Sequence, residues 1–203
     1  MKNNKKNSKR FNIYILLGIV IIFCAIIFFA YNLYNEINAD KYAKEALNQM
    51  DFMNKNKSIE DDEIPDYVLN PDIEMPIQTI NGIQYVGIIS LPTIDINLPV
   101  INTCDMDKLK KAPCKYSGSV YKDNMIIAGH NYRKHFTKLK QLQYGDEVVF
   151  IDIDGNIFKY VVKEIQVIQE KDISGMEQGD WDLTLFTCNS TGKARVTIRC
   201  EKV

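Results

Sequence analysis

Hydrophobic and polar residues follow three different patterns along the chain. Residues 13–30 are almost purely apolar, and residues 11–35 carry no charge. Residues 32–57 are mostly polar, with a weak apolar stripe at helical spacing. Beyond residue 80, short apolar or alternating runs are separated by turn signals such as Asn81-Gly82 and Asp154-Gly155. The pattern predicts an apolar helix, a polar helix and a β-rich domain.

The β-rich part contains seven strand-like runs. We predict strands at residues 84–89, 94–101, 124–128, 147–152, 157–169, 182–187 and 194–202. Short helices are expected at residues 105–111 and 133–142. Many short strands with few helices are typical of a closed β-barrel. The globular domain is therefore assigned to residues 80–203.

The segment before the β-rich domain is polar. Its apolar stripe at Leu33, Ile37, Tyr42, Ala46 and Met50 predicts a helical stalk. Residues 60–75 are acidic, contain no basic residue and are interrupted by prolines. They are interpreted as an extended, self-repelling linker, and a calcium site is the less favoured alternative. Residues 32–79 thus form the predicted stalk and linker.

Local charge determines how the N-terminal region is interpreted. The net charge of −1 argues against a nucleic-acid partner, but residues 1–10 contain five basic residues and no acidic one. The apolar stretch can span a bilayer of about 30 Å as a helix. We expect residues 1–10 in the cytoplasm, a single transmembrane helix at 11–31 and the remainder outside the cell membrane. A cleaved signal peptide is the alternative, although the stretch is long for one and no Ala-x-Ala site follows it.

The last two strand-like runs bring a cysteine and an arginine together. If the turn closes with Asn189 facing Ala194, Cys188 lies opposite Arg195, with Cβ atoms about 5 Å apart. By the two-residue period, one face carries Thr184, Phe186, Cys188, Arg195, Thr197 and Arg199. The other face carries Leu183, Leu185, Val196, Ile198 and Cys200. The second face is apolar and is interpreted as core, and the first as the floor of a groove. Arg195 is therefore a better partner for the thiol than Arg199.

Two histidines could act with this cysteine. His130 follows the run at 124–128, at a strand end where a rigid scaffold presents side chains to solvent. His135 lies in a segment rich in lysine and arginine, and we predict it on a solvated helix. His130 is therefore favoured as the catalytic base and acid, although it could also be a structural turn residue. Cys188 could likewise be a buried structural thiol.

These residues carry a resemblance to a known family. Thr184, Leu185, Thr187 and Cys188 match the Thr-Leu-x-Thr-Cys hallmark of the sortases, the membrane-anchored cysteine transpeptidases of Gram-positive bacteria. The Ala-Gly-His context of the family's histidine is matched at His130, and its arginine at Arg195. The resemblance covers roughly residues 80–203, and it implies an eight-stranded barrel. Six residues separate Cys188 from Arg195, which is short for the family.

The resemblance also implies an activity. Cys188 would attack a Leu-Pro-x-Thr-Gly-like sorting signal of a surface protein and form a thioester, with His130 moving protons and Arg195 stabilising the oxyanion. The acceptor would be a peptidoglycan precursor or a pilin amine. Phe186, Thr187 and Asn131 are candidate substrate-binding residues. No long helical insertion precedes residue 182 and no second apolar span follows, so the chain looks more like a class A, D or E enzyme than class B or C.

Other interpretations of the function remain open. The chain could be another Cys/His cell-wall peptidase or an L,D-transpeptidase, although no local motif of those enzymes surrounds the cysteine. It could also be a membrane-tethered β-domain that binds cell-wall peptides without cleaving them. Cys104 and Cys114 could form a loop disulfide, but spacing alone does not establish their separation. No ligand spacing indicates a metal site, and no cofactor is expected.

Overall fold

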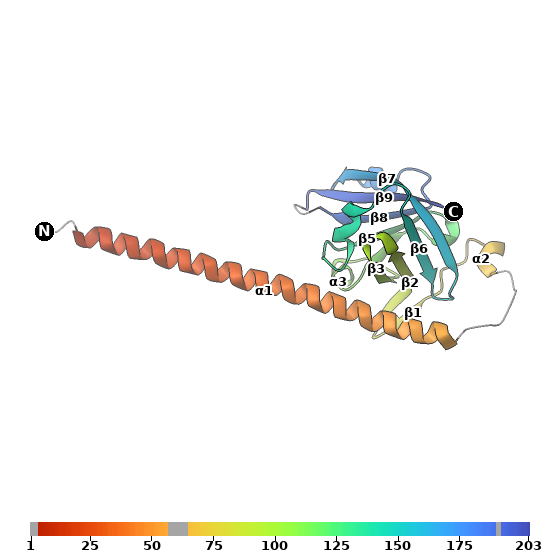
Figure 1. Cartoon of the computed structure of the whole chain (residues 1–203), viewed down its shortest axis with the longest axis horizontal. Coiled ribbons are helices and arrows are strands. Elements are labelled where there is room, and N and C mark those ends of the chain that lie inside the picture. The colour runs from red at the N-terminus through yellow and green to blue at the C-terminus, as the bar shows by residue number, and fades with distance from the viewer. Residues whose placement is uncertain (1–3, 57–64, 190–191) are drawn as a thin grey trace. The chain divides into compact units, whose positions relative to one another are not determined.

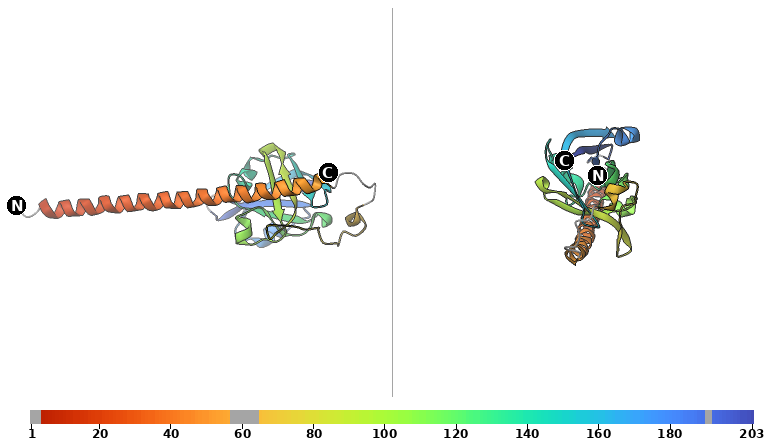
Figure 2. Two further views of the ribbon diagram at one scale, coloured as in Figure 1. Left: turned by 90° about the horizontal axis from the view of Figure 1, so that it is seen from below. Right: turned by 90° about the vertical axis from the view of Figure 1, so that its right-hand side faces the viewer.

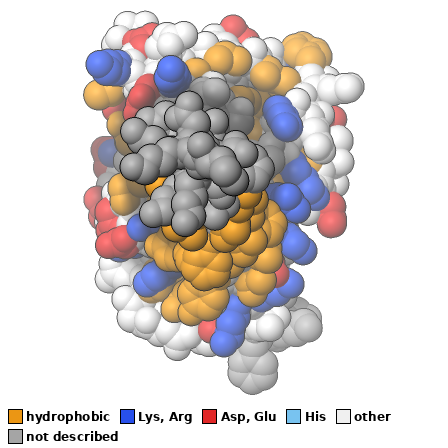
Figure 3. All heavy atoms as spheres, turned by 90° about the vertical axis from the view of Figure 1, so that its left-hand side faces the viewer, with side chains coloured by type: hydrophobic (Ala, Val, Ile, Leu, Met, Phe, Trp, Pro, Cys, Tyr) orange, Lys and Arg blue, Asp and Glu red, His pale blue; other side chains and the backbone are white. Residues whose placement is uncertain are grey.

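The structure is a computed structural model that describes residues 4–56, 65–189 and 192–203. It divides into two compact units, residues 1–37 and 38–203. The first unit is the N-terminal part of helix α1 (Asn4–Asn56). Large apolar side chains from Ile13 to Tyr34 are exposed, and apolar side chains form a broad surface in Figure 3. Among the described helices, α1 alone is long and apolar enough to cross a membrane.

The described residues of the second unit form nine strands and several short helices. Most of them are labelled in Figure 1. The strands are β1 (Gln78–Ile80), β2 (Ile83–Leu91), β3 (Ile96–Ile101), β4 (Cys114–Ser117), β5 (Met125–Gly129), β6 (Glu147–Asp152), β7 (Ile157–Gln169), β8 (Leu183–Cys188) and β9 (Ala194–Lys202). The α-helices are the end of α1, α2 (Asp66–Leu69), α3 (Met106–Leu109) and α4 (Ile173–Glu177). The 3-10 helices are η1 (Pro92–Ile94), η2 (Val120–Lys122) and η3 (Phe136–Gln141).

Eight of these strands close into a barrel, as predicted (Figure 2). Their order is β2-β3-β4-β5-β8-β9-β7-β6, and β6 returns to β2 in antiparallel pairing. A Cβ at Gly87 of β2 would lie 2.2 Å from the carbonyl oxygen of Ile151, so the closing pair needs glycine there. β1 adds to the edge of β2 and lies outside the ring. β5 and β8 run parallel, and β8 and β9 form an antiparallel hairpin.

The apolar core fills the interior of this barrel. Its members come from all the long strands and include Ile89, Val100, Ile127, Phe150, Leu185 and Ile198. The predicted core face of the β8–β9 hairpin is confirmed, because Leu183, Leu185, Ile198 and Cys200 are all fully buried in this cluster. The predicted strands at 147–152, 157–169 and 194–202 are also confirmed residue for residue.

The segment predicted as a helical stalk and an extended linker has packing contacts that the sequence pattern did not indicate. Within the second unit, Ala39, Ala43, Ala46 and Met50 of α1 are almost fully buried, because small side chains let the helix approach the barrel closely. The described part of the linker is also packed against the barrel: Tyr67 stacks on Tyr121, with ring centroids 4.6 Å apart. Met75 and Ile80 are buried. Residues 57–64 lie outside the described chain.

Candidate active site

Strand pairing aligns His130, Cys188 and Arg195 in one row across three neighbouring strands. Gly129 of β5 pairs with Thr187 of β8, and His130 and Cys188 are the next residues of these parallel strands. Cys188 pairs with Arg195 of β9. Adjacent strands lie about 4.8 Å apart, so the backbone positions of the three residues are neighbours, with Cys188 in the middle of the row. The predicted hairpin register is confirmed.

The turn between β8 and β9 closes as predicted. The backbone N–H of Asn189 donates to the carbonyl oxygen of Ala194 over 2.7 Å. Gly192 adopts a positive φ of 73° and donates its N–H to the Asn189 carbonyl oxygen over 3.0 Å. These bonds fix which residue of β9 faces Cys188.

Exposure distinguishes the cysteines of the second unit. Cys188 is exposed at the end of β8, whereas Cys200 is buried in the core. Burial raises the pKa of the Cys200 thiol to about 12, so that group stays protonated and unreactive. Cys104 and Cys114 form a disulfide. Cys188 is therefore the free, accessible thiol of the barrel.

His130 follows β5 at a position created by close packing. A Cβ at Gly129 would lie 2.2 Å from the ring of Phe136, so glycine lets that ring pack beneath the end of the strand. The Phe136 N–H donates to the His130 carbonyl oxygen over 3.2 Å. Burial, and secondly the charge of Lys110, lower the pKa of His130, which favours the neutral imidazole. Its Nδ1 is buried without a hydrogen-bond partner.

His135 is not on a solvated helix, and that prediction is wrong. Its side chain has no exposed surface. The following segment is the 3-10 helix η3, which buries Phe136 and Leu139 and leaves Lys140 exposed. Lys138 is half-buried, and its Nζ donates to the Ile94 carbonyl oxygen over 3.0 Å. Burial, and secondly the charge of His130, lower the pKa of His135 to about 4, and Asp40 opposes this shift. The basic neighbours in the sequence were misleading because a short 3-10 helix still has a buried side.

The two arginines of β9 occupy different environments. Arg195 is partly exposed; its guanidinium lies 5.7 Å from the centre of the Phe186 ring, and its Nη1 donates to the Glu170 carbonyl oxygen. Arg199 is 2% exposed. Its guanidinium donates to the carbonyl oxygens of Gly175 and Met176 in α4, over 2.6 and 2.8 Å, and to Thr184 Oγ1 over 2.9 Å. Arg199 therefore ties α4 to β8 and β9.

An apolar cluster lies on the same side of the sheet as Cys188. It contains Ile126, Ala128, Ile168, Met176 and Phe186, with Cys104 and Leu109 packed against it. The edge of the Tyr116 ring contacts Phe186, with centroids 5.5 Å apart. The cluster thus combines β5 and β8 with side chains from α4 and from the loop before β4. It forms an apolar floor beside the row of His130, Cys188 and Arg195.

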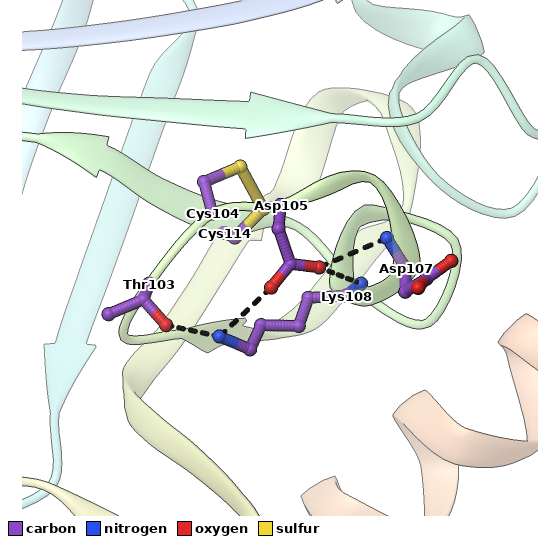
Figure 4. Close-up of a disulfide and its surroundings, with 6 residues drawn as sticks. All are labelled: Thr103, Cys104, Asp105, Asp107, Lys108 and Cys114. Atoms are coloured by element: carbon purple, nitrogen blue, oxygen red, sulfur yellow. Dashed lines mark hydrogen bonds and ion pairs between the residues drawn. A yellow bond between two sulfur atoms is a disulfide. The ribbon is translucent and has the colours of Figure 1, made fainter.

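The loop that borders this floor is held by the disulfide between Cys104 and Cys114 (Figure 4). Asp105 caps the short helix α3 by accepting from the N–H groups of Asp107 and Lys108, over 3.0 and 2.8 Å. Lys108 Nζ also donates to Thr103 Oγ1 (Figure 4). The loop is therefore fixed at both ends and presents Lys110 near His130.

Comparisons with known proteins agree with this geometry. The Sortase domain family model matches residues 89–203, more than half of the chain. The chain belongs to the sortase family. Sortase A of Bacillus anthracis is 29% identical over 127 residues, a match that covers 59% of this chain and 60% of the relative. The chain thus spans less than two thirds of the length of this relative.

Solved sortase structures share the fold. A Clostridium perfringens sortase D5 transpeptidase aligns with a TM-score of 0.57 at 21% identity, covering 82% of this chain and 98% of that one. Clostridium perfringens sortase C with the C-terminal cell wall sorting motif aligns with a TM-score of 0.58 at 23% identity, covering 75% of this chain and 96% of that one. The closed barrel is therefore the sortase barrel.

The three predicted substrate-binding residues are placed differently. Phe186 lies in the apolar floor beside Arg195. Asn131 accepts a hydrogen bond from Thr137 Oγ1 over 2.7 Å, which ties the His130 loop together. Thr187 is 3% exposed, and its hydroxyl lies buried without a partner. The structure therefore places Phe186 in the apolar floor, whereas the Thr187 side chain is not part of it.

Sequence reasoning missed the part of the apolar floor that α4 supplies. Met176 comes from α4, a five-residue helix that hydrophobic periodicity is too short to reveal. Asp172 caps it by accepting from the Gly175 N–H over 2.8 Å, and this Asp-Ile-Ser-Gly capping signal was available in the sequence. Among the side chains that the structure describes, no group of three or more metal-binding residues comes together.

Proposed function

We propose that the protein is a membrane-anchored sortase that acts as a cysteine transpeptidase. The observation that carries this proposal is the row of His130, Cys188 and Arg195 across β5, β8 and β9. A thiol with a proton carrier and a fixed cation on the neighbouring strands suits acyl transfer. Family membership supports the activity.

In this mechanism the Cys188 thiol gives its proton to His130, and the resulting thiolate attacks the carbonyl carbon of the scissile peptide bond. The carbon–nitrogen bond breaks, a thioester forms, and His130 gives a proton to the leaving amine. Arg195 donates hydrogen bonds to the oxygen that becomes negative in the transition state. The incoming amine then loses a proton to His130 and displaces the thiol. Because the pKa of His130 is lowered, only a minority of molecules carry the imidazolium at neutral pH.

The substrate is proposed to be a surface protein with a Leu-Pro-x-Thr-Gly-like sorting signal. The apolar floor around Phe186 and Ala128 suits the leucine and proline side chains of such a segment. A related barrel of known structure is described with a C-terminal cell wall sorting motif. The acceptor amine would come from a peptidoglycan precursor or a pilin lysine.

The proposed location is the outer face of the cell membrane. The apolar part of α1 is long enough to span the bilayer once, and the basic residues before it favour a cytoplasmic N-terminus. Protease added to intact protoplasts should then degrade the barrel. A barrel that resists digestion until the membrane is opened would contradict this orientation.

We place the enzyme closer to classes A, D and E than to B or C. The segment between β7 and β8 contains only the five-residue helix α4, whereas class B enzymes have a long helix there. The cysteine loop is short, as the six residues between Cys188 and Arg195 indicate.

Mass spectrometry of the purified full chain in detergent tests the proposal. Incubation with a Leu-Pro-x-Thr-Gly peptide and no amine should give an acyl adduct on Cys188 or slow hydrolysis. Addition of oligoglycine or a lysine-containing pilin peptide should divert the acyl group into an amide. Cys188→Ala should abolish both products and His130→Ala should depress both strongly, whereas Cys24→Ala in the apolar helix serves as the control and should keep both.

The possible outcomes separate the competing functions. Cleavage that survives in Cys188→Ala would exclude a sortase mechanism. Hydrolysis through Cys188 with no amide product from any amine would indicate a cysteine peptidase. Peptide binding without an adduct would indicate a wall-binding domain.

A further inference from the structure

His130 lacks the hydrogen bond that usually orients a catalytic imidazole. In cysteine and serine enzymes, a partner on the second ring nitrogen fixes the tautomer and the plane of the histidine ring. Here Nδ1 of His130 is buried and has no hydrogen-bond partner. The side-chain oxygen of the adjacent Asn131 accepts a hydrogen bond from Thr137 Oγ1. The orientation of the ring must therefore come from another contact.

That contact is an aromatic stack within the same loop. The rings of His130 and Tyr132 lie with centroids 3.9 Å apart and planes 19° from parallel. A stacked neighbour restricts rotation of the imidazole about its Cβ–Cγ bond without occupying either ring nitrogen. Tyr132 itself is only partly buried, so it needs support of its own.

His135 supports Tyr132 by a ring contact. Its ring meets Tyr132 edge to face, with centroids 5.5 Å apart and planes at 62°. The backbone N–H groups of His135 and Thr137 both donate to the Tyr132 carbonyl oxygen, over 3.0 and 3.3 Å. His135 is fully buried, and neither of its ring nitrogens has a hydrogen-bond partner. It therefore acts through the shape of its ring rather than through its nitrogens.

We propose that Tyr132 and His135 are positioning residues for His130: Tyr132 stacks on the catalytic imidazole, His135 packs edge to face against Tyr132, and together they hold the plane of the imidazole without a hydrogen bond. This inference rests on the proposed function only for its kinetic consequence. The geometric part concerns the His130 ring itself and can be measured without substrate.

Nuclear magnetic resonance of the full chain in detergent tests the geometric part. The chain has two histidines, so histidine-selective labelling gives two ring spectra. The Tyr132 ring should shift the His130 ring protons upfield through its ring current. Tyr132→Leu should remove this shift, Tyr132→Phe should retain it, and Tyr144→Leu, an exposed tyrosine outside the loop, should leave it unchanged. A His130 spectrum that is the same in Tyr132→Leu would overturn the proposal.

Steady-state kinetics with a sorting peptide test the consequence. Tyr132→Leu should lower kcat about tenfold or more with little change in KM, because a misplaced imidazole weakens proton transfer but not substrate binding. His135→Leu should have a smaller effect of the same kind, and His135→Phe, which restores a ring, should recover most of the loss. Thermal unfolding of each variant checks that the barrel is intact.

The results distinguish the possible failures. A loss confined to KM in Tyr132→Leu would make Tyr132 a substrate contact and overturn the positioning role. Activity in His135→Phe as low as in His135→Leu would show that the imidazole nitrogens matter, which contradicts a shape-only role. If the protein shows the predicted ring-current shifts but turns over no sorting peptide, the proposed function is contradicted and the stacking of Tyr132 on His130 is confirmed.

Discussion

A partly exposed pair, His130 and Arg195, and a buried pair, His135 and Arg199, contain the same two residue types. Arg195 and His130 are partly exposed beside Cys188. Arg199 and His135 lie within a few residues of them and are buried. The buried Arg199 donates hydrogen bonds to Gly175, Met176 and Thr184. Arg195 donates to the Glu170 carbonyl oxygen and lies over the Phe186 ring.

This difference shows that the residue type alone does not identify the catalytic member of each pair. A side chain can act on a substrate only if it reaches the groove and retains hydrogen-bond capacity. A buried copy has its capacity committed to the fold, and its removal leaves unpaired groups behind. Substitutions in the partly exposed pair should therefore change rates, and substitutions in the buried pair should change stability.

Removal of Arg195 should have the largest effect. Arg195→Ala should lower transpeptidation by about 10²–10³-fold, because a preorganised donor to the oxyanion is lost. The midpoint of urea unfolding should stay the same within error, since the side chain is partly exposed. Arg199→Ala is the matched variant and should lower turnover much less than Arg195→Ala. Equal losses in the two variants would remove the distinction between the partly exposed and the buried pair.

Removal of Arg199 should mainly destabilise the protein. Arg199→Met should lower the free energy of unfolding by about 3 kcal/mol, because two carbonyl oxygens of α4 and the Thr184 hydroxyl lose their donor. Urea titration measures this loss. Addition of Thr184→Val should recover part of it, since one unpaired hydroxyl disappears. A stable Arg199→Met variant would mean that the buried bonds contribute little.

The buried histidine should make the barrel sensitive to acid. His135 has a pKa of about 4 in the folded chain against an ordinary value of 6.5, so its contribution to stability is complete above pH 6.5. It should decline as the pH falls from 6.5 to 4, by up to about 3 kcal/mol, because only the unfolded chain accepts the proton there. His130 and Asp40 are the ionisable groups that act on His135.

Urea midpoints measured from pH 7 to pH 4.5 test this acid dependence. His135→Phe should show a flatter dependence than the natural chain, since the ring no longer titrates. Parallel curves for the two proteins would contradict the burial of a neutral imidazole.

The smallest effect should come from a charge near the groove that is itself exposed. Lys110→Gln removes a cation that lowers the pKa of His130, so that pKa should rise toward its ordinary value. Activity that depends on the imidazolium should then persist to higher pH. The shift should shrink as salt is added, because salt screens exposed charges. Histidine titration by nuclear magnetic resonance at two salt concentrations measures it.

The parts of the fold that sequence predicted well are those with strong local patterns. β7 and β9 have long alternating runs, and their bounds were predicted without error. The β8–β9 register followed from the turn geometry around Asn189. β4 was missed because it has only four residues and is held to β3 by a single pair, Ile101 with Cys114. The sequence could not decide whether Cys104 and Cys114 form a disulfide, because the spacing of two cysteines does not give their distance.

The candidate site shows the same division. The positions of Cys188, His130 and Arg195 could be predicted because each stands at a strand end next to a recognisable run. The burial of His135 could not, because its surroundings come from η3, from Tyr132 and from α1, which supplies Asp40. Contacts between distant segments leave no periodic signal in the chain.

The parallel pairing of β5 with β8 has a consequence for the order of folding. Cys188 and Arg195 meet across a hairpin, and such local contacts form within microseconds. His130 reaches the thiol only when β5 pairs with a strand far away in the chain, and contacts of that kind form late because a long loop must first close. We therefore expect a newly made chain to carry its thiol and its arginine together but without the histidine. Activity would then appear only with closure of the barrel.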